Sequence, residues 1–235
     1  MSIPRDTAWT RQPLTPRVWW MLGAAGLCLA VFFATIAWVF EDTAVSAAAA
    51  EFDRSISLAL ARLRDSGGPT GRMTEISAVG SPAVVLIFAV VLGSVILKSK
   101  DWLGFAHLTT VLLSASVLAR LLQYVWVRPR PETLLPYLTV TRHSFPSAHM
   151  FGAAACYVTF AFFYARYSRG RATEIVAHVL AFMLVVLIGF TRVYLGAHHT
   201  TDVIAGTAGG WAFGLLVAAT FSAWYTDRLA PRPPR

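Results

Sequence analysis

Apolar residues in this chain are gathered into six long blocks, and this pattern constrains the fold more than any other feature. Blocks of roughly 20 residues are long enough for an α-helix to cross a hydrocarbon core about 30 Å thick. Hydrophobic residues make up 56% of the 235 positions and charged residues only 14%, which is more apolar surface than one soluble core of this size can bury. We therefore expect an all-α, polytopic membrane protein, a six-transmembrane-helix bundle. Its predicted spans are residues 18–40, 76–97, 103–126, 148–164, 175–195 and 203–224.

The first apolar block, residues 18–40, is also the one that resembles a secretory signal. Three arginines precede it, and small residues at 44–50 follow it. Its apolar run is too long for the core of a signal peptide, so we expect a retained membrane anchor. Because the sequence contains no linker and no internal repeat, we expect one membrane domain over residues 1–235, with its motifs concentrated at about 120–202.

The basic residues indicate how the chain is oriented. The formal net charge is +8, but no basic stripe is present, so we expect no nucleic-acid partner. With a cytoplasmic N-terminus, both termini are cytoplasmic and most basic residues lie inside, as the positive-inside rule requires. These residues are Arg5, Arg11, Arg17, Lys98, Lys100, Arg166, Arg169, Arg171, Arg228, Arg232 and Arg235. Arg128, Arg130, Arg142 and Arg192 are left outside, where the rule disfavours them, so something other than topology must hold them there.

The one sizeable polar segment, residues 41–75, contains apolar residues at helical spacing. Phe52, Ile56, Leu60 and Leu63 recur every three or four positions with charged residues between them, which predicts a helix along the outer membrane interface. The glycines and proline at 67–69 would end this helix. Such a helix either braces the bundle or borders the route by which a lipid headgroup reaches a site.

Polar residues cluster at three places that this topology brings to one outer surface. The third span carries Arg120 and Gln123 toward its outer end, so one side of it should face protein or water. The segment that follows, residues 127–146, contains four prolines, which disfavour a regular helix, so we expect a loop there. The three polar clusters are residues 128–131, 144–149 and 191–202. Their convergence is the main indication of a function.

The residue types in these clusters suit a phosphoryl group. Arg130 and Arg192 would offer permanently charged, planar guanidinium groups that match phosphate oxygens. Ser147 follows Pro146 at the expected start of a helix, where its hydroxyl and nearby backbone N–H groups would donate to the same anion. We therefore expect an anion-binding pocket at the outer ends of the helices.

Two histidines, His149 and His198, supply what a two-step phosphoryl transfer needs. One attacks phosphorus to give a phosphohistidine, the other protonates the leaving alkoxide, and water then releases phosphate. Asp202 lies four residues after His198 and would hold one ring nitrogen so that the other can attack. Zinc ligation by His198, His199 and Asp202 is the alternative. Acidic residues are scarce and no cysteine is near, so we expect neither a metal nor another cofactor.

The spacing of these residues resembles the three motifs of the type 2 phosphatidic acid phosphatase superfamily. That family also includes glucose 6-phosphatases, bacterial lipid diphosphatases and vanadium haloperoxidases. Its motifs are lysine, six residues, Arg-Pro; then Pro-Ser-Gly-His; then Ser-Arg, five residues, histidine, three residues, aspartate. The matching positions here are Gln123, Arg130-Pro131, Pro146-Ser147-Ala148-His149, Thr191-Arg192, His198 and Asp202. The resemblance covers about residues 123–202 and extends to the six-span layout.

The resemblance implies a role for each matching residue. The implied phosphate-binding residues are Arg130, Ser147 and Arg192. The implied catalytic residues are His198 as nucleophile, His149 as acid for the leaving group and Asp202 as the carboxylate that orients His198. His199 could rival His198, but the motif spacing favours His198. Arg128 and Arg142 lie beside the motifs, where they would bind a second phosphate or headgroup or remain solvated loop charges.

Three positions depart from the family pattern: Gln123 replaces lysine, Ala148 replaces glycine and Thr191 replaces serine. Ala148 matters only if its position needs a positive φ angle. The Gln123 amide can still donate to a phosphate oxygen, but the charge of lysine is lost. Arg120 lies one helical turn before Gln123, so it would either supply the missing charge or extend to the outer headgroups.

The expected activity is hydrolysis of a phosphomonoester or diphosphate on a membrane lipid, at the outer face of the bilayer. By analogy with the family, the substrate would be polyprenyl diphosphate, phosphatidylglycerol phosphate, phosphatidic acid or a lipid-linked sugar phosphate, in a bacterial plasma membrane. Gln123 motivates an alternative, a non-catalytic lipid-phosphate binding or transport protein, although binding alone would not need both histidines and Asp202. Oxidation chemistry with bound vanadate does not suit a small lipid-embedded chain.

Overall fold

The computed structural model describes residues 15–41, 44–135, 138, 143–167 and 171–229, with side chains as far as residue 224. Helices occupy most of these residues, which confirms the all-α prediction. They are α1 (Pro16–Phe40), α2 (Ala44–Asp65), α3 (Thr70–Val79), α4 (Pro82–Lys98), α5 (Trp102–Val125), α6 (Ala148–Tyr167), α7 (Arg171–Tyr194) and α8 (Thr200–Leu229). α1, α5, α6, α7 and α8 are each long and apolar enough to cross a membrane, as a multi-pass membrane protein requires.

The second predicted span, residues 76–97, is not one continuous helix. α3 ends at Val79 and α4 begins at Pro82, and the two helices meet with a bend of 42°. Ser81 explains the break, because its hydroxyl caps α4 by accepting from Val84 N at 3.4 Å and Pro82 takes the first helical position. The prediction of six spans therefore holds only if α3 and α4 together form one bent span.

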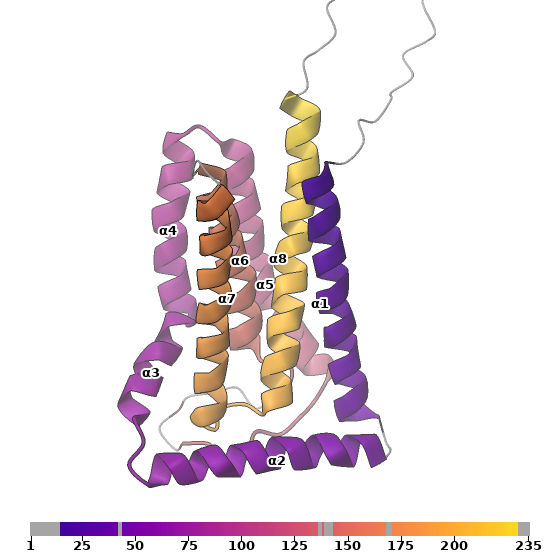
Figure 1. The fold of residues 1–235 in the computed structure, drawn as a ribbon, viewed down its shortest axis with the longest axis vertical. Helices are drawn as coiled ribbons and strands as arrows, with labels where there is room; N and C mark the ends of the chain where they lie inside the picture. The colour runs from indigo at the N-terminus through magenta and orange to yellow at the C-terminus, as the bar shows by residue number, and fades with distance from the viewer. Residues whose placement is uncertain (1–14, 42–43, 136–137, 139–142, 168–170, 230–235) are drawn as a thin grey trace, which may run out of the picture.

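The long helices run side by side, and α2 lies across one end of the bundle (Figure 1). The start of α1 and the last turns of α8 lie at the end opposite α2 (Figure 1). The basic residues described at that opposite end are Arg17, Lys98, Lys100, Arg166, Arg171 and, in the last turn of α8, Arg228. Five residues predicted inside, Arg5, Arg11, Arg169, Arg232 and Arg235, and the outer Arg142 lie outside the described residues.

α6 is the most buried of the spanning helices, and α8 packs against it along a row of glycines. Gly206, Gly210 and Gly214 recur every fourth residue, and a methyl group on any of them would collide with α6 or the residue before it. Small residues of this kind let two helix backbones approach closely in a membrane. The seam sets the starts of the two helices side by side, where Ser147 N donates to Asp202 O at 3.0 Å.

The helix predicted within residues 41–75 is present as α2, and it ends before Gly67, whose φ of 95° suits glycine. Of the apolar residues predicted at helical spacing, Phe52 and Leu63 are exposed and Ile56 and Leu60 are half-buried. The face turned toward the bundle is small or polar and consists of Ala49, Asp53, Ser57 and Ala61. One carboxylate of α2 is therefore buried against the protein, where the sequence pattern gave no reason to expect it.

Candidate active site

The chain reverses direction between α7 and α8, and this turn positions His198. Backbone N–H groups of Ala197 and His198 donate to Arg192 O at 3.0 and 3.3 Å and close the end of α7. Gly196 adopts a φ of 67°, and a side chain there would collide with the backbone of Thr133. Only glycine satisfies both requirements at this position.

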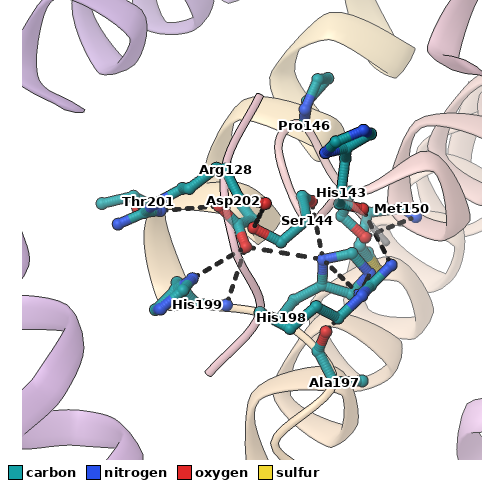
Figure 2. A network of polar contacts seen from close by, with 12 residues as sticks. Arg128, His143, Ser144, Pro146, Met150, Ala197, His198, His199, Thr201 and Asp202 are labelled. Carbon is teal, nitrogen blue, oxygen red and sulfur yellow. Dashed lines mark hydrogen bonds and ion pairs between the residues drawn. The ribbon is translucent and has the colours of Figure 1, made fainter. Parts of the chain in front are cut away.

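His198 is buried, and its two ring nitrogens have different surroundings (Figure 2). Nδ1 lies 3.0 Å from the carbonyl oxygen of Ser144, which can only accept, so Nδ1 carries the proton. Nη1 of Arg130 lies 3.0 Å from Nε2 and 3.4 Å from Nδ1, so the guanidinium lies against the ring and not on the line of the Nε2 lone pair. Because Nδ1 carries the one proton of the neutral ring, Nε2 keeps its lone pair. The ring is thus held in the tautomer that a nucleophilic imidazole needs.

The surroundings of His198 also keep it uncharged near neutral pH. Burial is the main cause, and with the charge of Arg130 it lowers the pKa of His198 from 6.5 to about 4, against the opposing effect of Asp202. Burial lowers the pKa of Arg130 as well, but a guanidinium starts high enough to stay charged. A neutral imidazole therefore faces a cation.

Asp202 lies in the first turn of α8, and its carboxylate is fully buried. Oδ2 accepts from the backbone N of His199 at 2.9 Å and lies 3.2 Å from that residue's Nδ1. The distance from Oδ2 to Nδ1 of His198 is 3.6 Å, which is too long for a good hydrogen bond. The carbonyl oxygen of Ser144 is therefore a closer partner of His198 than Asp202, the carboxylate predicted to orient it.

Arg128 lies at the centre of a buried ion network (Figure 2). Its Nη1 donates to Asp202 Oδ1 at 2.7 Å and to Thr201 Oγ1 at 2.8 Å. Its Nη2 donates to Asp53 Oδ2 at 2.8 Å. The guanidinium is thus paired with two carboxylates and is not a solvated loop charge.

Arg130 has contacts of another kind. Its guanidinium donates to the carbonyl oxygens of Ala197 and His143, the latter at 3.1 Å, and lies against the ring of His198. These contacts fix the guanidinium beside the ring of His198, the nucleophile that the motifs predict. The structure thus brings the first and third motifs together at one point.

The second motif forms the start of α6. Ser147 caps this helix, because its Oγ accepts from Met150 N at 3.3 Å. Ala148 is the first helical residue and does not have a positive φ angle, so its methyl group is accommodated where the family has glycine. Gln123 is buried, and its Nε2 donates to Pro146 O at 2.9 Å. The residue that replaces the family lysine therefore fixes the loop of the second motif.

α3 contributes residues that the sequence did not indicate. The carbonyl oxygen of Ser77 lies 3.1 Å from Nε2 of His149, and the Ser77 hydroxyl accepts from Nη1 of Arg192 at 3.0 Å. Gly80 lies so close to His149 that a methyl group there would fall 2.7 Å from Nε2. Arg192 Nε is buried and has no hydrogen-bond partner among the described residues. One turn of α3 thus holds both the second histidine and the second arginine.

Arg120 lies outside this cluster. Its side chain is exposed, whereas Gln123, one turn further along α5, is buried. None of the described cluster residues contacts Arg120. This placement favours extension to the headgroups over a phosphate contact.

The remaining sequence predictions concern metal binding and the choice of residues. In the described part of the chain, no three His, Cys, Asp or Glu side chains gather as metal ligands. Sequence reasoning missed Asp53, Ser77 and the carbonyl of Ser144, because isolated polar residues and backbone groups carry no motif. The burial of a residue on α2 or α3 depends on how these helices pack against the bundle, so the sequence alone does not predict it.

Comparison with known proteins places this site in a family. The model of the PAP2 superfamily matches residues 104–226, more than half of the chain. Phosphatidylglycerophosphatase B of Bacillus subtilis is 30% identical over 191 residues, which cover 80% of this chain and 89% of that protein. Lipid A 1-phosphatase of Rhizobium etli is 33% identical over 132 residues, which cover 52% of each chain.

A solved structure is similar over nearly its whole length. It is described as the crystal structure of the first transmembrane PAP2 type phosphatidylglycerolphosphate phosphatase from Bacillus subtilis, and it matches with a TM-score of 0.74 at 26% identity. The match covers 89% of this chain and 99% of that one. All three polar clusters lie within the region that the family model matches, whereas Asp53 and Ser77 precede it. The chain therefore belongs to the PAP2 superfamily, the type 2 phosphatidic acid phosphatases, and is a membrane phosphatase.

Proposed function

We propose that the protein hydrolyses the phosphate ester of a membrane lipid through a phosphohistidine at His198. The observation that carries this proposal is the ring of His198, whose Nδ1 is held by the Ser144 carbonyl while Nε2 lies 3.0 Å from Arg130. A phosphoryl group bound by this guanidinium would lie beside the nitrogen lone pair. Positioning and neutralisation of charge are what phosphoryl transfer chiefly requires.

The proposed reaction has two steps. In the first, Nε2 of His198 bonds to phosphorus, the bond from phosphorus to the lipid oxygen breaks, and His149 gives that oxygen a proton. In the second, water attacks phosphorus, its proton passes to His149, and the P–N bond breaks to release inorganic phosphate. Arg130 and Arg192 offset the charge on the transferring oxygens. No step uses a metal.

The substrate that we propose to test first is phosphatidylglycerol phosphate. The relative that covers most of this chain and the similar solved structure are both named for that activity. Lipid A 1-phosphate is the next candidate, and polyprenyl diphosphate and phosphatidic acid follow. All four keep an acyl or prenyl tail in the bilayer while the phosphate reaches the ends of the helices, where the cluster lies.

Phosphate release by the purified protein tests the proposal. The protein is assayed in lipid vesicles with each of the four substrates, with and without a chelator. We expect release with at least one substrate, unaffected by the chelator, and loss of about 10⁴-fold or more in His198→Ala. Brief reaction with substrate labelled at the phosphate should leave acid-labile label on the wild-type protein and none on His198→Ala. Full turnover by His198→Ala would exclude His198 as the nucleophile.

We further propose that the site faces away from the cytoplasm of a bacterial cell, in one domain with α2 on the membrane interface. The support is the group of basic residues that flank the spans at the end of the bundle opposite α2, namely Arg17, Lys98, Lys100, Arg166 and Arg171. Single cysteines at the exposed positions Ser66 and Ser99, in a background without Cys28 and Cys156, lie at the two ends. An impermeant thiol reagent on intact cells should label Ser66→Cys and spare Ser99→Cys; the reverse result would invert the orientation.

A further inference from the structure

Asp53 is the one acidic residue of α2 that is turned into the protein. Its side chain is 1% exposed, and the neighbours one turn away on the same face, Ala49 and Ser57, are small enough to let the bundle approach. Burying a carboxylate is unfavourable unless charges and hydrogen bonds compensate. The position of Asp53 therefore depends on its partners.

Those partners lie in the first and third polar clusters, residues 128–131 and 191–202. Oδ1 accepts from the backbone N of Thr201 at 3.0 Å, and Oδ2 accepts from the Thr201 hydroxyl at 2.5 Å and from Arg128 Nη2 at 2.8 Å. The Thr201 N–H belongs to the first turn of α8, where backbone donors have no partner within their own helix. Asp53 thus caps the helix that carries Asp202, and does so from a segment almost 150 residues earlier.

Arg128 extends this contact to the nucleophile. Nη2 of Arg128 donates to Oδ2 of Asp53, while Nη1 donates to Oδ1 of Asp202 at 2.7 Å. The other oxygen of Asp202 then lies 3.6 Å from Nδ1 of His198. A continuous line of contacts runs from α2 through Arg128 and Asp202 to the attacking ring, and Asp53 has no place in the family motifs.

We propose that Asp53 is a positioning residue for the reaction: by fixing Arg128 and the first turn of α8, it holds Asp202 in the orientation that His198 needs. This inference rests on the proposed function. Asp53 does not touch the phosphoryl group, so its loss should slow the chemical step and leave substrate binding by Arg130 and Arg192 unchanged. A residue that only fastened α2 to the bundle would lower stability without this kinetic signature.

The test compares Asp53→Asn with Glu51→Gln, which removes one charge from an exposed position of the same helix. Steady-state rates and single-turnover phosphoenzyme formation are measured in vesicles and normalised to the folded fraction. For Asp53→Asn we expect kcat and the phosphorylation rate to fall about 10- to 100-fold with KM within threefold, since small displacements of a catalytic group have effects of this size. Glu51→Gln should match the wild type.

Thr201→Val provides a second variant, because it removes the hydrogen bond that the hydroxyl donates to Asp53 and the one that it accepts from Arg128, and keeps the charge pair between Asp53 and Arg128. We expect kcat to fall about three- to tenfold with KM unchanged, and this variant decides the question if Asp53→Asn does not fold. The inference is overturned if kcat of the folded variants stays within threefold of the wild type, or if KM alone changes. A wild-type enzyme whose turnover does not depend on His198 would instead overturn the proposed function.

Discussion

The two sides of the active site balance their charges differently. On the side of α2, Arg128 lies between the carboxylates of Asp53 and Asp202, and all three groups are paired. On the side of α3, Arg192 donates to the hydroxyl of Ser77 and keeps a buried Nε without a partner among the described residues. A buried cation is unfavourable without a counter-charge. The ion pairs on the α2 side therefore compensate one another and fix the positions of the three groups. On the α3 side the positive charge of Arg192 has no counter-charge in the part of the chain that the structure describes, and an anionic substrate would supply one.

The largest expected effect is on stability, and it tests the ion network of Arg128 with Asp53 and Asp202. Arg128→Gln leaves two buried carboxylates without their shared cation, so the free energy of unfolding should fall by about 3–5 kcal/mol. Arg54→Gln, at an exposed position of α2, is the matched control and should have no effect. Denaturant unfolding in detergent micelles measures both. If Arg128→Gln is as stable as the wild type and only raises KM, Arg128 binds substrate and the contrast between the two sides is wrong.

The next largest effect tests the side facing the substrate. Arg130→Gln and Arg192→Gln each remove a charged donor to the transferring phosphoryl group, so kcat/KM should fall about 10²- to 10³-fold. Stability should change little in Arg192→Gln, because no carboxylate loses a partner. Phosphate release in vesicles and thermal unfolding of the same samples check both statements. Less than tenfold loss in Arg192→Gln would remove Arg192 from the phosphate site.

A smaller effect concerns pH. In the proposed reaction the neutral form of His198 attacks, so with its pKa lowered to about 4 by burial, activity should persist on acidification and decline as pH falls through 4. At pH 5 about 90% of His198 is still neutral, compared with a few per cent for a histidine of ordinary pKa. The profile of kcat/KM reports the free enzyme, to which this pKa applies, and the ionisation of the free lipid phosphate is titrated separately and subtracted. A tenfold loss of kcat/KM between pH 7 and pH 5 beyond that correction would contradict this pKa for the nucleophile.

The smallest effect is expected at Arg120. Its exposed side chain lies outside the cluster, so Arg120→Ala should change kcat/KM by less than about threefold. Gln123→Ala is the informative partner, because it removes the hydrogen bond to Pro146 O and should loosen the second motif. Equal, large losses of kcat/KM in both variants would show that Arg120 contributes to the phosphate site.

The membrane spans could be predicted because few backbone structures can cross a lipid bilayer. Backbone groups must be satisfied within each helix, so long apolar blocks become helices whatever else surrounds them. The ends of the first and third predicted spans, 18–40 and 103–126, differ from α1 and α5 by only one or two residues. The break at Gly80 and Ser81 was missed because the apolar run continues across it, although Ser81-Pro82 is a local signal for a helix start.

The candidate site was predictable only where its residues come as motifs. Arg130, His149, His198 and their neighbours have fixed spacings, and the order of spans predicts that they meet. Asp53 and Ser77 have no such spacing, and their roles depend on how α2 and α3 pack against α7 and α8. The sequence predicted α2 as a helix along the membrane interface, but helical spacing cannot distinguish a solvated carboxylate from one that binds a partner far along the chain.

The glycine seam between α6 and α8 has a consequence for how such enzymes diversify. With Gly206, Gly210 and Gly214 in backbone contact with α6, these two helices have no room to shift or to accept larger side chains. The start of each helix carries a residue of the proposed site, His149 on α6 and Asp202 on α8, so a displacement of either helix would disturb the site as a whole. We therefore expect substitutions in the segments around these two helices, and not in the glycine seam, to alter which lipid is accepted. The lipid A 1-phosphatase of Rhizobium etli aligns with 52% of this chain.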